Sequence, residues 1–188
     1  SEAVSGGTFG TFFAAGAGDV NKDGTPDIFI GDYAAQRGEA AGTGRAYVFS
    51  GVDGTPIHVF EAESDGDGLG PGRGIPDVNG DGHADLSIAA WTSSAGTPNG
   101  GKVYIYSGAD GSVLHTATGT IEGDSLGVDA LSVGDVTGDD KQDYMLTAVG
   151  KDFSGSDVGH VYIVRFAEPS AQLTMTPLLG GCRPIQPE

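Results

Sequence analysis

Three short segments of the chain concentrate carboxylates and amides in a turn-forming context. They read DVNKDGTPD at 19–27, DVNGDGHAD at 77–85 and DVTGDDKQD at 135–143. Counted from the first Asp, each segment has side-chain oxygens at positions 1, 3, 5 and 9, and the first two have Gly at position 6. Ca²⁺ prefers 6 to 8 oxygen ligands, and alternating oxygens in a tight turn supply them, together with the main-chain carbonyl at position 7. The pattern therefore predicts a hard-cation site in each segment.

The predicted ligands follow one rule in all three segments: side-chain oxygens at positions 1, 3, 5 and 9, and the main-chain carbonyl of position 7. They are Asp19, Asn21, Asp23, Thr25 and Asp27; Asp77, Asn79, Asp81, His83 and Asp85; and Asp135, Thr137, Asp139, Lys141 and Asp143, with Thr25, His83 and Lys141 binding through the backbone. The third segment departs from the rule, because Thr137 carries no charge and Asp140 replaces the Gly that adopts this backbone most easily.

The acidic segments could also be EF-hand loops, magnesium sites or plain turns. An EF-hand needs a bidentate Glu at position 12, where this chain has Ile30, Ile88 and Leu146. Magnesium prefers a compact octahedron that retains several waters. Asp, Asn and Gly also form turns without any ion. Three recurrences favour the ion, because clustered carboxylates repel one another unless a cation lies among them. We expect three bound Ca²⁺ ions.

The acidic segments belong to an internal repeat. A constant 58 residues separate Asp19 from Asp77 and Asp77 from Asp135. GRAYVFSGVDG at 44–54 recurs as GKVYIYSGADG at 101–111, and more faintly as GHVYIV at 159–164. A fixed period of this size indicates stacked supersecondary units, each of which needs a neighbour to bury its apolar face.

Each unit reads as four short strands, because runs of Val, Ile, Tyr and Phe alternate with Gly, Asp and Pro. No stretch shows apolar residues at helical spacing. The expected strands are 11–17, 27–32, 45–50 and 57–62; 69–76, 86–91, 102–107 and 112–117; and 126–133, 143–149, 160–164 and 171–175. The predicted fold is all-β, with three four-stranded antiparallel propeller-type blades.

The expected domain limits follow the repeat. Blades cover about 7–64, 65–122 and 123–167 within a domain of residues 1–167, and 168–188 form a C-terminal tail or docking arm. Propellers close with about 4 to 8 blades, so three blades leave apolar faces and strand edges to be covered. We expect self-association, a partner chain or further blades of a longer protein to cover them.

Composition excludes some partners. The chain of 188 residues has 26 acidic and 9 basic side chains, a net charge of −17, which repels nucleic acid and anionic membranes. No run approaches the roughly 20 apolar residues that span a bilayer, and the first residues lack the pattern of a signal peptide, so we expect a soluble chain without membrane insertion. The single cysteine, Cys182, cannot form an internal disulfide and could link two chains.

The segment FGTFFAAGAGDVNKDGTPDIFIGD at 9–32 resembles the FG-GAP repeat of integrin α-subunit propellers and their bacterial relatives. Leu-Gly replaces Phe-Gly at 69–70 and 126–127, and the GAP triplet is degraded to GDY, AAW and AVG. The resemblance covers about residues 7–165. It implies calcium-binding blades that are mostly extracellular or at the cell surface and serve adhesion, ligand recognition or accessory roles, with the calcium structural.

An enzymatic function needs convergent catalytic groups, and the histidines are the candidates. His58 and His115 occupy equivalent repeat positions, His83 is at position 7 of a predicted metal loop, and His160 aligns with the basic residues of the other units. Matched positions favour a scaffold, so we expect a non-enzymatic module for structure, adhesion or binding of a protein or glycan. The alternative is the propeller portion of a polysaccharide lyase or hydrolase.

Two further features are interpreted as structural. DFSGS at 152–156 matches a metal-dependent adhesion pattern, but that pattern works in a doubly wound fold, so we interpret it as a polar loop. Tyr33 and Trp91 end equivalent strands, and we expect them to pack against neighbouring side chains rather than to bind a ligand.

Overall fold

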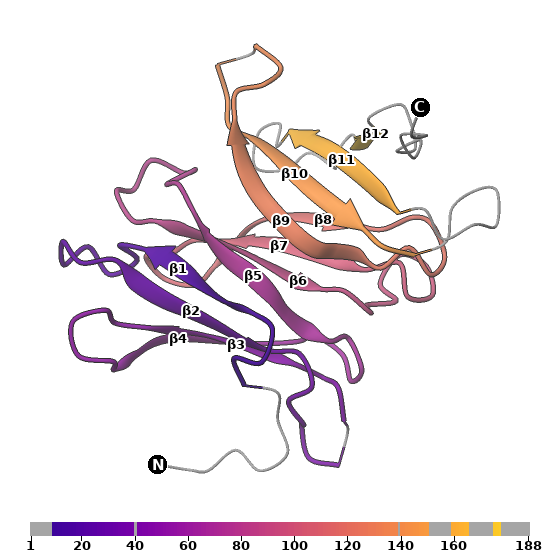
Figure 1. Cartoon of the computed structure of the whole chain (residues 1–188), viewed down its shortest axis with the longest axis horizontal. Coiled ribbons are helices and arrows are strands. Elements are labelled where there is room, and N and C mark those ends of the chain that lie inside the picture. The colour runs from indigo at the N-terminus through magenta and orange to yellow at the C-terminus, as the bar shows by residue number, and fades with distance from the viewer. Residues whose placement is uncertain (1–8, 40, 139, 151–158, 166–174, 178–188) are drawn as a thin grey trace, which may run out of the picture.

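The structure of the chain, a computed structural model, describes residues 9–39, 41–138, 140–150, 159–165 and 175–177. These residues form three four-stranded antiparallel sheets, and none of them lies in a helix. We call the sheets blade 1, blade 2 and blade 3 in chain order. Figure 1 shows them stacked face to face, with blade 2 in the middle, and the three described sheets do not close into a ring. The predicted all-β fold of three propeller-type blades is confirmed.

Each blade has a simple strand order. Blade 1 contains β1 (Ala14–Gly18), β2 (Asp27–Asp32), β3 (Arg45–Phe49) and β4 (Pro56–Glu61). Blade 2 contains β5 (Leu69–Ile75), β6 (Asp85–Ala90), β7 (Lys102–Tyr106) and β8 (Val113–Thr118). Blade 3 contains β9 (Leu126–Gly134), β10 (Asp143–Ala148), β11 (His160–Arg165) and β12 (Met175–Pro177).

The strands lie close to their expected ranges, with two differences. β1 begins at Ala14 instead of residue 11, because Gly10 turns the chain with φ of 66° and the ladder begins at the Ala14–Ile30 pair. The fourth strand of blade 3 is β12, which pairs with β11 and begins at the last residue of the expected range 171–175. The other residues of that range lie outside the described residues.

The core lies between the blades, because alternate residues of each strand face opposite neighbours. One apolar cluster joins blades 1 and 2 and includes Phe29, Val48 and Leu86. A second cluster joins blades 2 and 3 and includes Ile105 and Leu146. Blade 2 is therefore buried on both faces, and all six residues of β6 are buried.

The first strand of each later blade is hydrogen-bonded to the blade before it. The Leu69 N–H donates to the Thr43 carbonyl at 3.1 Å, and the Leu126 N–H donates to the Gly100 carbonyl at 2.9 Å. We call this arrangement the blade junction. β5 also packs against β1, β2 and β3, and β9 packs against β5, β6 and β7. The junction and the apolar clusters together fix one blade on the next.

Several sequence features lie outside the described residues. They are the DFSGS segment at 152–156 and the predicted tail at 168–188, which contains Cys182, except for residues 175–177 of β12. Within the described part of the chain, no helix is long and apolar enough to cross a membrane.

Candidate metal centre

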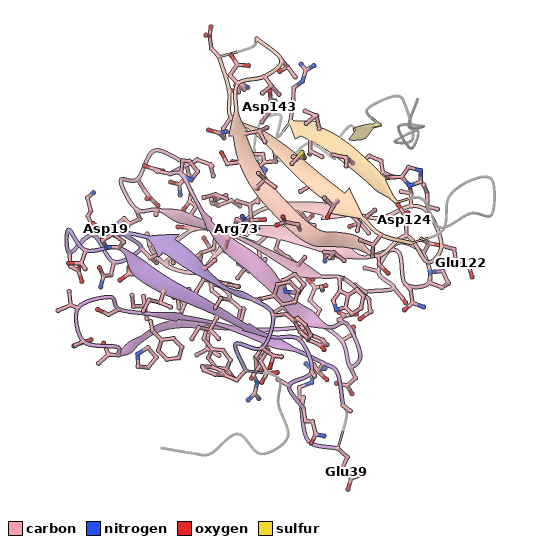
Figure 2. All side chains as sticks on the ribbon, in the orientation of Figure 1. Asp19, Glu39, Arg73, Glu122, Asp124 and Asp143 are labelled. Atoms are coloured by element: carbon pink, nitrogen blue, oxygen red, sulfur yellow. The ribbon has the colours of Figure 1, made fainter. Side chains whose placement is uncertain are left out.

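The three acidic segments form equivalent loops at the same end of the strands in each blade. They connect β1 to β2, β5 to β6 and β9 to β10. Figure 2 shows Asp19 and Asp143 at this end, whereas Glu39, Glu122 and Asp124 lie at the opposite end of the strands. The repeat therefore places the candidate ligands of all three loops on one rim of the molecule.

The loops share an unusual backbone conformation. In each loop the residues at positions 4 and 6 have positive φ, a region that residues other than Gly adopt uncommonly. The angles are 63° and 87° at Lys22 and Gly24, 81° and 86° at Gly80 and Gly82, and 77° and 61° at Gly138 and Asp140. Asp140 adopts the conformation of the Gly it replaces, at the energetic cost that a side chain brings to it. The third loop thus keeps the shape of the others despite its altered sequence.

The Asp at position 1 organises each loop through backbone N–H groups. Asp19 Oδ1 accepts the Asp23 N–H at 3.0 Å, and Asp19 Oδ2 accepts the Gly24 N–H at 2.9 Å. Asp77 accepts the equivalent Gly82 N–H at 2.7 Å, and Asp135 accepts the Asp140 N–H at 2.8 Å. The position-1 carboxylate therefore lies inside the curve of the loop in all three blades.

The side chains at positions 3 and 5 contact each other in the first two loops. Asn21 Nδ2 donates to Asp23 Oδ2 at 2.8 Å, and Asn79 Nδ2 donates to Asp81 Oδ2 at the same distance. Asp81 Oδ1 accepts the His83 N–H at 2.9 Å, which lowers the pKa of this exposed carboxyl. In the third loop Asp139 lies outside the described residues.

The Asp at position 9 begins the second strand of its blade and is buried in all three cases, as Asp27, Asp85 and Asp143. Asp85 Oδ2 accepts the Val78 N–H at 2.7 Å, and Asp85 Oδ1 accepts the Gly108 N–H at 3.0 Å. Burial raises the pKa of Asp85, its two backbone donors oppose that shift, and the nearby acidic side chains of its own loop add to it. Asp85 thus fastens its loop to the strand, and the neighbouring carboxylates repel its charge there.

Both oxygens of Asp27 are engaged in the same way. Asp27 Oδ2 accepts the N–H groups of Val20 and Asn21 at 2.8 and 3.3 Å, and Asp27 Oδ1 accepts the Gly51 N–H at 3.0 Å. The partner Gly51, like Gly108 in blade 2, belongs to the turn after the third strand. A Cβ at either glycine would overlap a loop carbonyl, that of Pro26 or Ala84. Sequence reasoning missed this contact, although the Ser-Gly that follows the third strand of blades 1 and 2, at 50–51 and 107–108, marks its position.

The donor chemistry suits a hard divalent cation, because Asp and Asn side chains and carbonyl groups provide only oxygen. A carboxylate has about four lone-pair sites, so Asp19, which accepts two N–H groups, retains acceptor capacity, whereas Asp27 with three retains little. Among the described residues, no three His, Cys, Asp or Glu side chains are gathered closely enough to hold a metal. The ligand sets stay a prediction.

The first two loops contact each other across the blade boundary. The Ala84 N–H donates to the Asp19 carbonyl at 3.0 Å, and His83 Nδ1 lies 2.7 Å from the Val20 carbonyl oxygen. Lys22 Nζ donates to the Asp81 carbonyl at 3.2 Å. The side chain of His83, considered in the sequence only for its carbonyl, therefore joins adjacent loops. Nothing in a single repeat unit could signal this contact.

The other histidines lie on separate elements. On β4, His58 Nε2 is 2.6 Å from the Gly108 carbonyl oxygen of blade 2. On β11, His160 Nδ1 is 3.3 Å from Asp124 Oδ1, and Asp124 Oδ2 accepts the hydroxyl of Tyr162 at 3.1 Å. Burial lowers the pKa of His115 on β8. His58 thus connects two blades and His160 connects a strand to the turn before β9, as expected of a scaffold.

The aromatic side chains at the opposite end pack against one another. The rings of Tyr33 and Trp91 meet edge to face with centroids 6.2 Å apart, and Phe13 contacts Tyr33 in the same way at 6.3 Å. The expected packing role of the two strand-end aromatics agrees with these contacts.

Comparison with known proteins adds a family and a fold. The model of the FG-GAP repeat matches residues 11–49 and 74–106, which include the acidic loop and the following two strands of blade 1 and of blade 2. Integrin alpha-3 of Cricetulus griseus is 31% identical over 134 residues, which cover 65% of this chain and 12% of the integrin.

A solved structure supports the same architecture. The chain superposes on the rhamnogalacturonan lyase PL11 of Bacillus licheniformis with a TM-score of 0.51 and 14% identity, over 86% of this chain and 32% of the lyase. At this identity the similarity concerns the fold alone. The chain spans about an eighth of the integrin and about a third of the lyase.

Proposed function

The chain carries FG-GAP repeats like those of integrin alpha subunits, and on this premise we propose that it is an extracellular calcium-braced module that acts as a structural, adhesion or protein-interaction scaffold. Calcium at positions 1, 3 and 5 of each loop holds the connection between the first two strands of a blade. The position-7 carbonyl and the buried position-9 carboxylate complete or support the site.

The observation that supports calcium is the common shape of the loops. Three loops with different sequences have positive φ at the same two positions and turn a position-1 carboxylate into the loop. The loops also concentrate charge: burial is the main cause that raises the pKa of Asp85, and the carboxylates of Asp81 and Asp77 in the same loop add to it. A bound divalent ion would relieve this repulsion, and three ions would cancel six of the seventeen excess negative charges.

An extracellular location agrees with loops of this composition. Sites with few carboxylates fall toward the weak end of calcium affinities, about 10⁻⁴ to 10⁻³ M, which suits extracellular modules. The related integrin alpha-3 supports the same location. The lyase supports only the fold, and the rings of His58, His83 and His160 contact carbonyl groups or a carboxylate, so a scaffold is better supported than a lyase or hydrolase.

The test is a calcium titration followed by thermal unfolding. An ion that binds only the folded chain stabilises it by mass action, about 2 kcal/mol per site at fifty times the dissociation constant. We expect the Tm to rise with millimolar calcium and to return to its starting value with chelator. Asp23→Asn should reduce the rise, because it removes one ligand charge from an exposed loop position.

Glu39→Gln is the matched control. It removes the same charge from an exposed residue at the opposite end of the strands, so the calcium response should equal that of the wild type. Equal Tm values with calcium and with chelator would refute the calcium proposal, as would an equal loss of response in both variants.

A further inference from the structure

Blade 1 exposes a sheet face whose counterparts in the other blades are buried. In blade 2 the residues that face blade 1 are Leu86, Ile88, Tyr104 and Tyr106, at most 8% exposed, and in blade 3 those that face blade 2 are Tyr144, Leu146, Tyr162 and Val164, at most 5% exposed. The equivalent residues of blade 1 are Ile28, Ile30, Tyr47 and Phe49. Ile28 is 46% exposed, and Val59, which pairs with Tyr47 on the same face, is 53% exposed.

This face retains the chemistry of a blade interface. The rings of Tyr47 and Phe49 are stacked, with centroids 6.0 Å apart. Phe9 packs edge-on against both rings and is itself 47% exposed. In the later repeats Leu69 and Leu126 replace this Phe, and both are buried in the two interblade clusters. The open face of blade 1 is therefore built like the faces that accept a preceding blade.

Blade 3 exposes the complementary face at the other end of the stack. Its outer face includes Val161, which is 38% exposed, and Ile163. The equivalent residues of blade 2 are Val103 and Ile105, which are 1% and 0% exposed against blade 3. Those of blade 1, Ala46 and Val48, are fully buried against blade 2. The chain thus carries both halves of one repeated interface, one half at each end.

We propose that two copies of the chain associate head to tail, with the open face of blade 1 in each copy packing on the open face of blade 3 in the other. The contact repeats the interface already present twice within each copy. Two copies give six blades, within the range of about 4 to 8 in which propellers close, whereas three copies exceed that range. A head-to-tail contact that closes on itself forms a ring and leaves no face open.

The net charge of −17 opposes association, and the faces carry a few charged side chains, the ion-paired Arg45 and Glu61 on blade 1 and Arg165 on blade 3. The other residues named on the two faces are apolar or aromatic, and about 0.15 M salt screens charges beyond about 8 Å. Association depends on the blade faces and holds whether or not the loops bind calcium. Light scattering reports the association, and calcium titration reports the proposed function, so failure of one is distinguishable from failure of the other.

The experiment measures the mass of the 188-residue chain by size-exclusion chromatography with light scattering at micromolar concentration, with calcium and with chelator. We expect twice the monomer mass. Ile28→Glu and Val161→Glu should each give a monomer, because each places a charge on one open face. Val113→Glu is the control, since Val113 is 51% exposed on β8 of the middle blade, which has no open face, and it should leave the dimer intact.

Mixing the two monomeric variants distinguishes a head-to-tail contact from a symmetric one. Ile28→Glu keeps its blade 3 face and Val161→Glu keeps its blade 1 face, so one natural contact can form between them. The mixture should have a higher mean mass than either variant alone. Circular dichroism and Tm confirm that each variant is folded.

Three results would overturn the proposal. The first is a monomeric wild type, which would assign the faces to another chain or to other blades. The second is a dimer that folded Val161→Glu retains while Ile28→Glu loses it, which would indicate two blade 1 faces in contact. The third is a mixture of folded variants that stays monomeric.

Discussion

Asp81 and Asp85 belong to the same loop, yet the structure gives their carboxylates different tasks, and substitution to Asn should separate them. Asp85 is fully buried and accepts two backbone N–H groups, from Val78 and Gly108. Asp81 is exposed and accepts hydrogen bonds from Asn79 and His83 of its own loop and, at 3.3 Å, from the Ser107 hydroxyl. In the absence of calcium, Asp85→Asn should destabilise the chain, whereas Asp81→Asn should leave its Tm close to that of the wild type.

The magnitude follows from the two hydrogen bonds of Asp85. The Asn carbonyl can keep one N–H partner, but its NH₂ group then faces the other N–H, and an unsatisfied buried donor costs about 1–3 kcal/mol. Removal of a buried charge whose pKa is raised offsets part of this cost. The expected loss is about 2 kcal/mol, which corresponds to about 4–8 °C in Tm for a chain of this size.

The assay is thermal unfolding followed by circular dichroism, in chelator and then in millimolar calcium. Asp81→Asn should lose part of the calcium-induced rise in Tm even though its calcium-free Tm is unchanged. Equal calcium-free Tm values for Asp85→Asn and the wild type would refute this division of tasks, and so would a comparable loss in Asp81→Asn.

Three other substitutions test the packing and the electrostatics. Gly108→Ala places a Cβ against the Ala84 carbonyl and should lower the midpoint of urea unfolding. Gly54→Ala is the control, because nothing lies near the added Cβ and only the cost of the positive φ remains. Equal losses in the two variants would contradict the clash at Gly108. Leu146→Ala, at a fully buried position between blades 2 and 3, should cost about 2–5 kcal/mol in urea unfolding, and a loss well below that range would place the side chain outside the core. Burial holds the pKa of His115 below its ordinary 6.5, so below that pH the unfolded chain takes up a proton that the folded chain resists, and stability is lost. As the pH falls from about 7.5 to about 5.5, the Tm of His115→Asn should therefore fall less than that of the wild type. A constant difference in Tm between the two across that range would contradict the buried, neutral imidazole.

The sequence predicted the features that recur within one unit. β2 begins and ends at the expected residues, 27 and 32, because an acidic turn precedes the apolar run at 28–30 and Gly31 and Asp32 close it. The left-handed backbone at Asp140 was anticipated from the Gly that occupies its position in the other loops. Local spacing and residue type were sufficient for these predictions, since each depends on a few neighbouring residues.

Contacts between units could not be predicted in this way. The His83 ring contacts Val20, and His58 contacts Gly108, in each case across about fifty residues or more of chain and a blade boundary. Such pairs depend on how far one sheet is rotated and shifted on the next, which the packing of whole faces determines. The prediction for Asp27 was incomplete for a related reason. It named Asp27 only as a metal ligand, and its hydrogen-bond partner Gly51 comes from another turn of the same blade.

The blade junction has a consequence for how such a chain can change in length. Thr43 and Gly100 lie at corresponding sites 57 residues apart, and so do Leu69 and Leu126, so each copied unit brings both the donor and the acceptor for its attachment. A tandem duplication of one full period would insert a new sheet whose two attachments are already encoded, without altering any neighbouring residue. We expect gene duplication or grafting by whole periods to be tolerated, while insertions of a partial period would separate each donor from its acceptor.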